Sequence, residues 1–205
     1  MTVIAVLTGS SSSESAIQLV SHGKLIGSTG VPGYLVPKNW FSHFYIYGVF
    51  AMLLVAENRG SLGWILLFAH LVRRVIEQVY LFPGDKDSKM HVGAYMLGFL
   101  FYTMVTLYVP DNPSSAFLWL LGNIIQHVSH AQLFRNRSSN ASKSAPPQFL
   151  LFRYMNCPHY FGEMLIYVGL SSIESLDSIA CALFVIVSLS INWRNHTRWY
   201  SKQVK

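Results

Sequence analysis

The segment from residue 70 to 77 places charged side chains inside an otherwise apolar stretch. His70, Arg73, Arg74 and Glu77 are spaced three or four residues apart, so one helix would carry them on neighbouring faces. A charged side chain within a membrane helix costs roughly 2.5–3.5 kcal/mol on insertion scales, which makes such residues functional candidates. Two interpretations stay open, a ligand or phosphate site and an internal ion pair that stabilises the helix end.

A second candidate site is the segment 156–163, Asn-Cys-Pro-His-Tyr-Phe-Gly-Glu. Proline is favoured in the first turn of a helix, and the free N–H groups of a helix N-terminus can bind anions or amides. Glu163 then enters an apolar run, where its carboxylate needs a partner. The alternative interpretation is ordinary capping by Asn156, with Glu163 paired to an arginine.

A third candidate is the segment 192–200, Asn-Trp-Arg-Asn-His-Thr-Arg-Trp-Tyr, at the inner end of the last apolar run. It is basic, aromatic and rich in hydrogen-bond donors. Taken alone, it also fits an aromatic belt at the membrane interface with arginines that reach toward water.

Several other chemistries lack their motifs. His127 and His130 are spaced like the histidine pairs of di-iron membrane enzymes, but the sequence has no second pair, so no metal site is expected. The GxSxG elbow of serine hydrolases, the Walker loop and the GxGxxG fingerprint are absent from the sequence. Any nucleotide would therefore bind without a soluble Rossmann module.

The elements that must position these residues are helices in a membrane. Of the 205 residues 52% are hydrophobic and only 12% charged, about half the charged fraction of a soluble domain. A bilayer core needs roughly 20 helical residues, and the sequence predicts an all-α integral membrane protein with about six transmembrane helices. Their approximate ranges are 41–56, 61–82, 92–109, 115–133, 160–173 and 176–193, the fifth being short and extended through 149–152 or lying in the interface.

Positive charge indicates the orientation. With a cytosolic N-terminus, fourteen of the fifteen Lys and Arg residues lie on the cytosolic side and only Arg59 outside. Both termini are then cytosolic, and the sequons at Asn136, Asn140 and Asn195 are expected to carry no glycan. The basic residues lie in short segments rather than on one exposed face, so nucleic-acid binding is not expected. The polar loop 135–147 faces the cytosol.

Five segments together resemble the steroid 5-alpha-reductase family, most closely its polyprenol reductase branch. The segments, in family order, are His22-Gly-Lys24, Val36-Pro-Lys-Asn-Trp-Phe-Ser-His-Phe-Tyr45, Arg73-Arg-Val-Ile-Glu77, Cys157-Pro-His-Tyr-Phe-Gly-Glu-Met-Leu-Ile-Tyr167 and His196-Thr-Arg-Trp-Tyr-Ser-Lys202. The resemblance implies a bundle of about seven helices in the endoplasmic reticulum membrane, formed here by residues 36–205 after a cytosolic segment 1–35. It also implies NADPH as cofactor and a long-chain polyprenyl lipid as substrate, in dolichol synthesis that supports protein N-glycosylation.

Carried over residue by residue, the resemblance also assigns a cofactor site. Glu163 looks like the family's cofactor-binding acid, and the other residues on family positions near the dinucleotide are Arg74, Tyr154, His159, His196, Arg198 and Tyr200. His159 stands where the family usually has Asn.

For the reacting end, the family's Glu and Tyr pair is not recognisable, and His43 and Tyr45 are the candidates. Hydride adds to a carbon–carbon double bond only when the resulting charge has a sink. The direct substrate is therefore expected to be a conjugated polyprenal, with Tyr45 or His43 stabilising the enolate oxygen.

The chain also departs from the family pattern. It looks truncated at both ends, without the family's first helix and without the YPKxRKAxxPF tail, and its cytosolic loop is shorter. Two alternatives are therefore kept, an inactive relative that binds only a lipid or a partner, and a membrane methyltransferase of the isoprenylcysteine type that binds S-adenosylmethionine.

Overall fold

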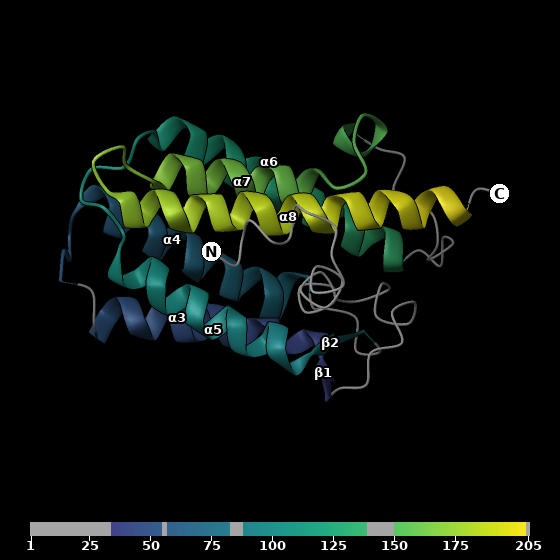
Figure 1. Ribbon diagram of the computed structural model, residues 1–205. Helices are drawn as coiled ribbons and strands as arrows, with labels where there is room; N and C mark the ends of the chain where they lie inside the picture. The colour runs from purple at the N-terminus through teal and green to yellow at the C-terminus, as the bar shows by residue number, and fades with distance from the viewer. Residues whose placement is uncertain (1–33, 55–56, 83–87, 139–149, 204–205) are drawn as a thin grey trace, which may run out of the picture.

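The computed structural model describes residues 34–54, 57–82, 88–138 and 150–203, and these are mostly helical (Figure 1). Each of the six expected apolar stretches contains one α-helix. The helices are α3 (Phe41–Leu54), α4 (Leu62–Ile76), α5 (Val92–Leu107), α6 (Ala116–Ser138), α7 (Pro158–Leu170) and α8 (Leu176–Gln203). The short elements are β1 (Leu35–Pro37), η2 (Lys38–Trp40), η3 (Glu77–Leu81), β2 (Lys89–His91) and η4 (Leu150–Arg153). The resemblance at His22 to Lys24 and the sequon at Asn140 lie outside the described residues.

Local sequence explains where several helices begin. The Ser61 hydroxyl accepts a hydrogen bond from the Trp64 N–H at 3.2 Å and caps α4. At α5 the His91 ring Nδ1 accepts from the Gly93 N–H at 3.0 Å. Pro158 occupies the first turn of α7, where its missing N–H costs no helical hydrogen bond.

Two helix boundaries differ from the sequence prediction. Helix α8 continues to Gln203 instead of ending near residue 193, so the third candidate segment is helical throughout. Helix α7 begins at Pro158 and does not extend back through residues 150–152, which belong to the separate turn η4 (Leu150–Arg153). The reason is that a proline disfavours the helical conformation of the residue before it, and Cys157 has φ −140° and ψ 63°.

The all-α prediction also missed a small antiparallel sheet. Strands β1 and β2 pair with Val36 opposite Met90, and the Lys38 N–H donates to the Ser88 carbonyl at 2.7 Å. This pairing joins the start of α3 to the start of α5. Strands of three residues are too short to show the alternation on which a sequence prediction depends.

The helices run up and down along one another (Figure 1). The connections α5–α6 and α7–α8 lie at one end of the bundle, where the Ser114 N–H donates to the Ser171 carbonyl at 2.6 Å. The strands and the C-terminal end of α8 lie at the other end (Figure 1). Arg59 follows α3 at the first end, whereas Lys38, Lys89 and Arg135 fall at the second.

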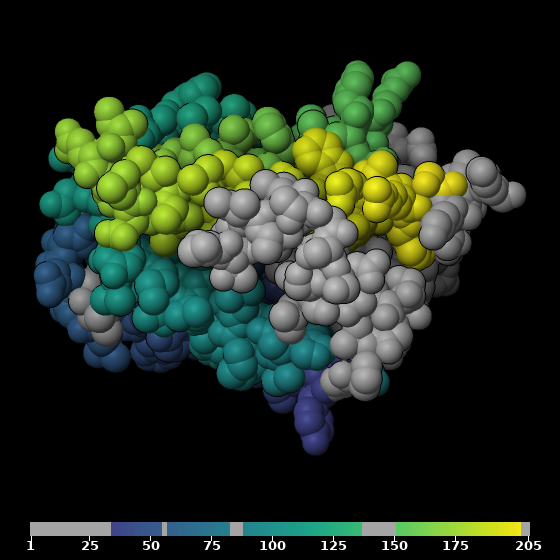
Figure 2. All heavy atoms as spheres, viewed as in Figure 1, coloured from purple at the N-terminus to yellow at the C-terminus, as the bar shows by residue number. Residues whose placement is uncertain are grey.

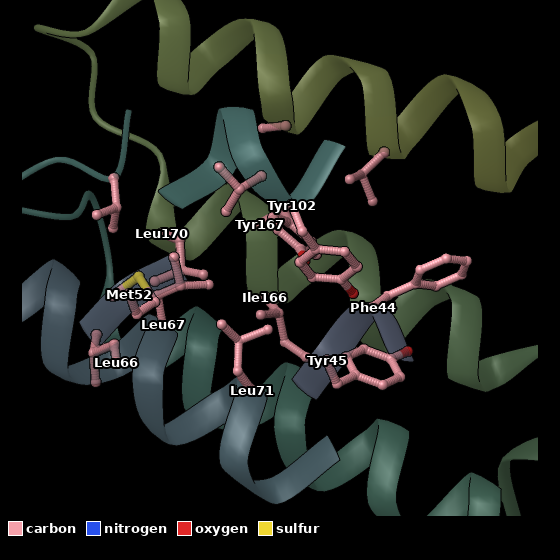
Figure 3. Packing of buried hydrophobic residues seen from close by; sticks show 14 of the residues in the cluster. Phe44, Tyr45, Met52, Leu66, Leu67, Leu71, Tyr102, Ile166, Tyr167 and Leu170 are labelled. Atoms are coloured by element: carbon pink, nitrogen blue, oxygen red, sulfur yellow. The ribbon is translucent and has the colours of Figure 1, made fainter. Parts of the chain in front are cut away.

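The buried core lies where α3, α4, α5 and α7 meet. Figure 3 shows Met52, Leu67, Leu71 and Ile166 packed together, and each of these four side chains is fully buried. Tyr45, Tyr102 and Tyr167 continue this core toward the polar residues described below (Figure 3).

Helices α6 and α7 approach each other closely at two glycines. A Cβ atom on Gly122 would lie 2.5 Å from the Gly162 carbonyl oxygen, and one on Gly162 would lie 2.8 Å from the Gly122 carbonyl oxygen. Small residues at such positions allow two helix backbones to approach, as in membrane bundles.

Of the described helices, one is long and apolar enough to cross a membrane by length and composition, the segment Leu176–Ser201 of α8 with a mean hydropathy of 1.8. Helix α5 is apolar but shorter, and α6 includes Asn123, Gln126, His127 and His130, which lower its hydropathy. Figure 2 shows side chains of α8 and α5 next to each other on one face of the molecule. Leu183 and Phe184 of α8 and Leu100 of α5 are exposed. Exposed apolar surface of this kind is typical of contact with a membrane or another protein.

Candidate functional site

The candidate site is centred on the carboxylate of Glu77, at the start of η3. Its side chain is 1% exposed and accepts hydrogen bonds from Arg73, from Arg74 Nη1 at 2.6 Å and from His127 Nδ1 at 2.6 Å. Of the two interpretations of this segment, the internal ion pair is therefore present in the structure. The ligand site stays a prediction.

Arg74 connects Glu77 to Tyr45 on α3. Its Nη2 donates to the Tyr45 hydroxyl oxygen at 3.0 Å, and its guanidinium carbon lies 4.8 Å from the centre of the Tyr45 ring. Its Nη1 also contacts His130 Nδ1 at 2.8 Å, and this ring nitrogen must then be the acceptor. Because Tyr45 accepts from Arg74, its own hydroxyl hydrogen is free to point to a different acceptor.

Arg73 connects Glu77 to Glu163 through α6. Its Nε donates to Asn123 Oδ1 at 2.9 Å, and its Nη2 donates to Gln126 Oε1. The Gln126 Nε2 in turn donates to Glu163 Oε2 at 3.1 Å. The Glu163 carboxylate on α7 thus belongs to the same hydrogen-bonded cluster as Glu77, although 86 residues separate the two in sequence.

Three of the residues expected at the cofactor lie along one row of rings. His159 is 5.6 Å from His130 and 4.3 Å from Tyr160 between ring centres. Tyr160 is 5.9 Å from His196, which is 6.5 Å from Tyr200. The row connects the Glu77 cluster to the C-terminal part of α8, and this connection exists because α8 stays helical beyond residue 193.

The remaining candidates lie apart from this cluster. Tyr154 is 81% exposed, in the connection between η4 and α7, and Arg198 is exposed on α8. His43 is exposed as well, with its Nδ1 2.9 Å from the Tyr95 hydroxyl. His43 and Tyr45 are two residues apart on α3, so they point to different faces of the helix, one to Tyr95 and the other to Arg74.

Buried polar atoms without a hydrogen-bond partner mark where a polar ligand would fit. In the described part of the chain they include Arg74 Nε, His159 Nδ1, His70 Nε2 and Tyr167 Oη. An unpaired buried donor or acceptor costs about 1–3 kcal/mol. A dinucleotide with amide, hydroxyl and phosphate groups could satisfy such atoms, so the residues present fit the expected cofactor.

The sequence reasoning missed Asn123, Gln126 and Tyr160. Asn123 and Gln126 are buried on α6 and bond Arg73, and together with His127 and His130 they follow the same helical spacing as the charged residues of α4. A search of the stretch 115–133 for polar residues at that spacing would have found them.

A cysteine nucleophile and a metal site find little support in the described residues. Cys157 and Cys181 are free thiols, and burial raises the pKa of Cys157 to about 12, so its thiol is a poor nucleophile near neutral pH. Within the described ranges, no group of three His, Cys, Asp or Glu side chains is arranged to hold a metal ion.

Comparison with known proteins identifies relatives that are themselves members of the reductase family which the sequence motifs resemble. The sequence model of the family 3-oxo-5-alpha-steroid 4-dehydrogenase matches residues 91–205. The chain is 29% identical to a polyprenal reductase of Saccharomyces cerevisiae over 185 residues, covering 84% of this chain and 70% of the relative. It is 25% identical to polyprenal reductase 1 of Arabidopsis thaliana, covering 91% and 82%. It is 28% identical to the rat 3-oxo-5-alpha-steroid 4-dehydrogenase 1, covering 80% and 69%.

Proposed function

Because this chain belongs to the 3-oxo-5-alpha-steroid 4-dehydrogenase family, we propose that it uses NADPH to reduce the alpha-isoprene double bond of a polyprenyl lipid. The relatives are oxidoreductases that act on carbon–carbon double bonds, and those named polyprenal reductase point to the prenyl substrate. The proposed role is in dolichol biosynthesis, which supports protein N-glycosylation. The methyltransferase alternative receives no support from these relatives.

The observation that carries the proposal is the buried cluster that joins Tyr45, Arg74, Glu77, Gln126 and Glu163. These residues come from α3, α4, η3, α6 and α7, and a single hydrogen-bonded network connects them through Arg73. Buried, connected polar groups in a mostly apolar bundle are expensive to maintain, and such groups are typical of functional sites.

The reaction follows from the chemistry of a conjugated aldehyde. Bound NADPH would supply a hydride to the carbon β to the carbonyl group, and the electron pair of the double bond then moves onto the carbonyl oxygen as an enolate. The Tyr45 hydroxyl can donate a hydrogen bond to that oxygen, since Arg74 already donates to Tyr45. Protonation of the α-carbon restores the saturated aldehyde.

The cofactor would be held by residues on α4, α7 and α8. Arg74 supplies positive charge, Glu163 supplies an acceptor for the nicotinamide amide, and His159, His196 and Tyr200 supply a row of rings. Arg198 and Tyr154 are exposed, so we assign them to the outer, phosphate-bearing part of the site.

The proposed location is the endoplasmic reticulum membrane, with all six helices crossing the bilayer and both termini in the cytosol. The separation of Arg59 from Lys38, Lys89 and Arg135 at opposite ends of the bundle supports this orientation. Four polar residues of these two helices are buried in the interior, where they avoid contact with lipid: His70 and Arg74 on α4, and Asn123 and Gln126 on α6.

The test is NADPH-dependent conversion of polyprenal by membranes that contain this chain or its Glu163→Gln variant. Glu174→Gln is the matched control, because Glu174 is exposed in the connection between α7 and α8. We expect reduction by the unmodified chain and by the control, and loss of reduction in Glu163→Gln. If the folded protein neither reduces polyprenal nor binds NADPH, the inactive relative is favoured. Methyl transfer from S-adenosylmethionine would favour the methyltransferase.

A further inference from the structure

A groove of about 380 Å³ opens on the surface formed by α4, η3 and α6, and the proposed reaction does not use it. Its walls are apolar and come from Phe68, Ala69, Val72, Ile76 and Leu81. Three polar side chains, those of Arg73, Glu77 and His127, complete the lining; we call them the floor of the groove, and they contribute only a small part of its surface. We name it the lateral groove, because it opens on the side of the bundle rather than at either end.

The backbone helps to shape one edge of this groove. Helix α4 passes into the π-helical turn η3, in which the Phe82 N–H donates to the Glu77 carbonyl at 2.6 Å, five residues back. A π-helical turn is wider than an α-helical turn, and such turns occur frequently at functional sites. The turn leaves Ile76 and Leu81 exposed at the groove, at 45% and 47%.

The floor of the groove is shared with the proposed reaction site. Glu77 Oε1 accepts from Arg73 and His127, which line the groove, whereas Oε2 accepts from Arg74, which contacts Tyr45. The Glu77 carboxylate and the Arg74 guanidinium therefore lie between the groove and Tyr45, the candidate reacting residue. A second connection runs from Arg73 through Gln126 to Glu163.

The charges on the floor favour a neutral head group. Arg73 and Arg74 both pair with Glu77, and Glu163 belongs to the same cluster, so two carboxylates balance the two guanidinium groups. A phosphate would have to approach the Glu77 carboxylate, whereas an aldehyde or hydroxyl oxygen needs only a hydrogen-bond donor. Arg73 can donate, because its guanidinium carries five N–H groups, and its side chain is 23% exposed.

The apolar walls suit a hydrocarbon chain that continues beyond the groove. The volume lies at the lower end of the roughly 300–1,000 Å³ found for ligand pockets, so a long lipid would fill it with only its first units. Ile65 lies on the same face of α4 as Ala69, Val72 and Ile76, and it is 49% exposed. The rest of the chain can therefore leave along an apolar surface.

We propose that the lateral groove is the docking site at which a polyprenal enters from the bilayer, with its oxygen on Arg73 and its first isoprene units against the apolar walls. This inference rests on the proposed function for the identity of the lipid. It adds the route by which the lipid arrives, along the surface of α4 and η3 beside His127 of α6.

The experiment fills the groove in the chain of 205 residues. Ala69→Trp places a large ring between the walls, and Ala69→Leu fills part of the same space. Leu100→Trp is the matched control, because Leu100 is 52% exposed on α5, away from the groove. The probe is a short prenal with a photoreactive diazirine on its terminal isoprene unit, and the labelled residues are mapped by peptide mass spectrometry.

We expect the unmodified chain and the Leu100→Trp variant to be labelled in residues 62–82 and 116–138. An excess of polyprenal without the diazirine should reduce this labelling. Ala69→Trp should lose this labelling, and its KM for polyprenal should rise about tenfold while kcat stays unchanged. The reason is that docking contacts stabilise the bound substrate and the transition state equally, so their loss raises KM alone. Ala69→Leu should give a smaller change in the same direction, which a misfolded protein would not.

Three outcomes would overturn the inference. They are labelling confined to other helices, unchanged labelling and KM in Ala69→Trp, and cross-links in the groove from a second copy of the chain in place of the prenal. An unmodified chain that lacks reductase activity but is labelled in the groove would instead overturn the proposed reaction and support lipid docking. The two proposals can therefore fail separately.

Discussion

Tyr45 and His43 are distinguished by their neighbours. Tyr45 is 5% exposed and accepts a hydrogen bond from Arg74, whereas His43 is exposed and contacts Tyr95 and Trp40. Both were predicted at the reacting end from the same motif. Only Tyr45 belongs to the cluster that also contains Glu163, so we place the hydrogen bond to the enolate oxygen on Tyr45.

Replacing Tyr45 by Phe should lower kcat for polyprenal about 10²-fold while leaving NADPH affinity nearly unchanged. The ring and its packing against Arg74 remain, and only the donor to the developing oxyanion is lost. Single-turnover kinetics and NADPH titration would measure the two effects. His43→Gln is the comparison variant, and a larger loss of kcat in His43→Gln than in Tyr45→Phe would move the role to His43.

At the scale of elements, the packing of α6 on α7 decides where Glu163 lies. Gly122 and Gly162 allow the backbones to approach so that Gln126 can reach Glu163 at 3.1 Å. A larger residue at either glycine would separate the helices and stretch this contact. The two glycines therefore act on the site without belonging to it.

Gly122→Ala should lower the free energy of unfolding by about 1–3 kcal/mol, because its Cβ would meet backbone atoms that cannot move away. Gly48→Ala is the control, since a Cβ there would lie 3.1 Å from a Leu71 methyl group that can adjust. Thermal unfolding in detergent measures both. Equal stability of the two variants would contradict the close packing described here.

At the scale of the whole molecule, the proposed orientation places the strands, η4 and the C-terminal end of α8 in the cytosol. Asn136 lies near the end of α6, and Asn195 lies on the C-terminal part of α8. Both sequons should therefore remain unglycosylated, because the transferase acts on the opposite side of the membrane. The sequon at Asn140 lies outside the described residues, and the same prediction holds for it.

Digestion with an endoglycosidase should leave the electrophoretic mobility of the chain unchanged. A variant with a long Gly/Ser loop that carries one sequon, inserted after Asp111 in the connection between α5 and α6, should show a mobility shift. A shift in the unmodified chain that disappears on replacing Asn136 or Asn195 would reverse the orientation.

The sequence by itself determined the six helical stretches, the family and the helical spacing that makes Arg73 and Glu77 neighbours. Each of these depends on local information: hydrophobic runs, motifs, and the helical spacing that makes residues three or four apart neighbours. The same local information placed Pro158 in the first turn of α7 but not the small sheet, whose two strands are 51 residues apart.

Only the tertiary structure decided which of the candidate residues meet. Tyr45 reaches Arg74, and Gln126 joins Arg73 to Glu163, because α3, α4, α6 and α7 pack side by side. The lateral groove likewise depends on the position of His127 of α6 beside α4 and on the wider turn of η3. Such contacts join residues far apart in sequence, and one sequence contains no local signal for the distance and rotation between two packed helices.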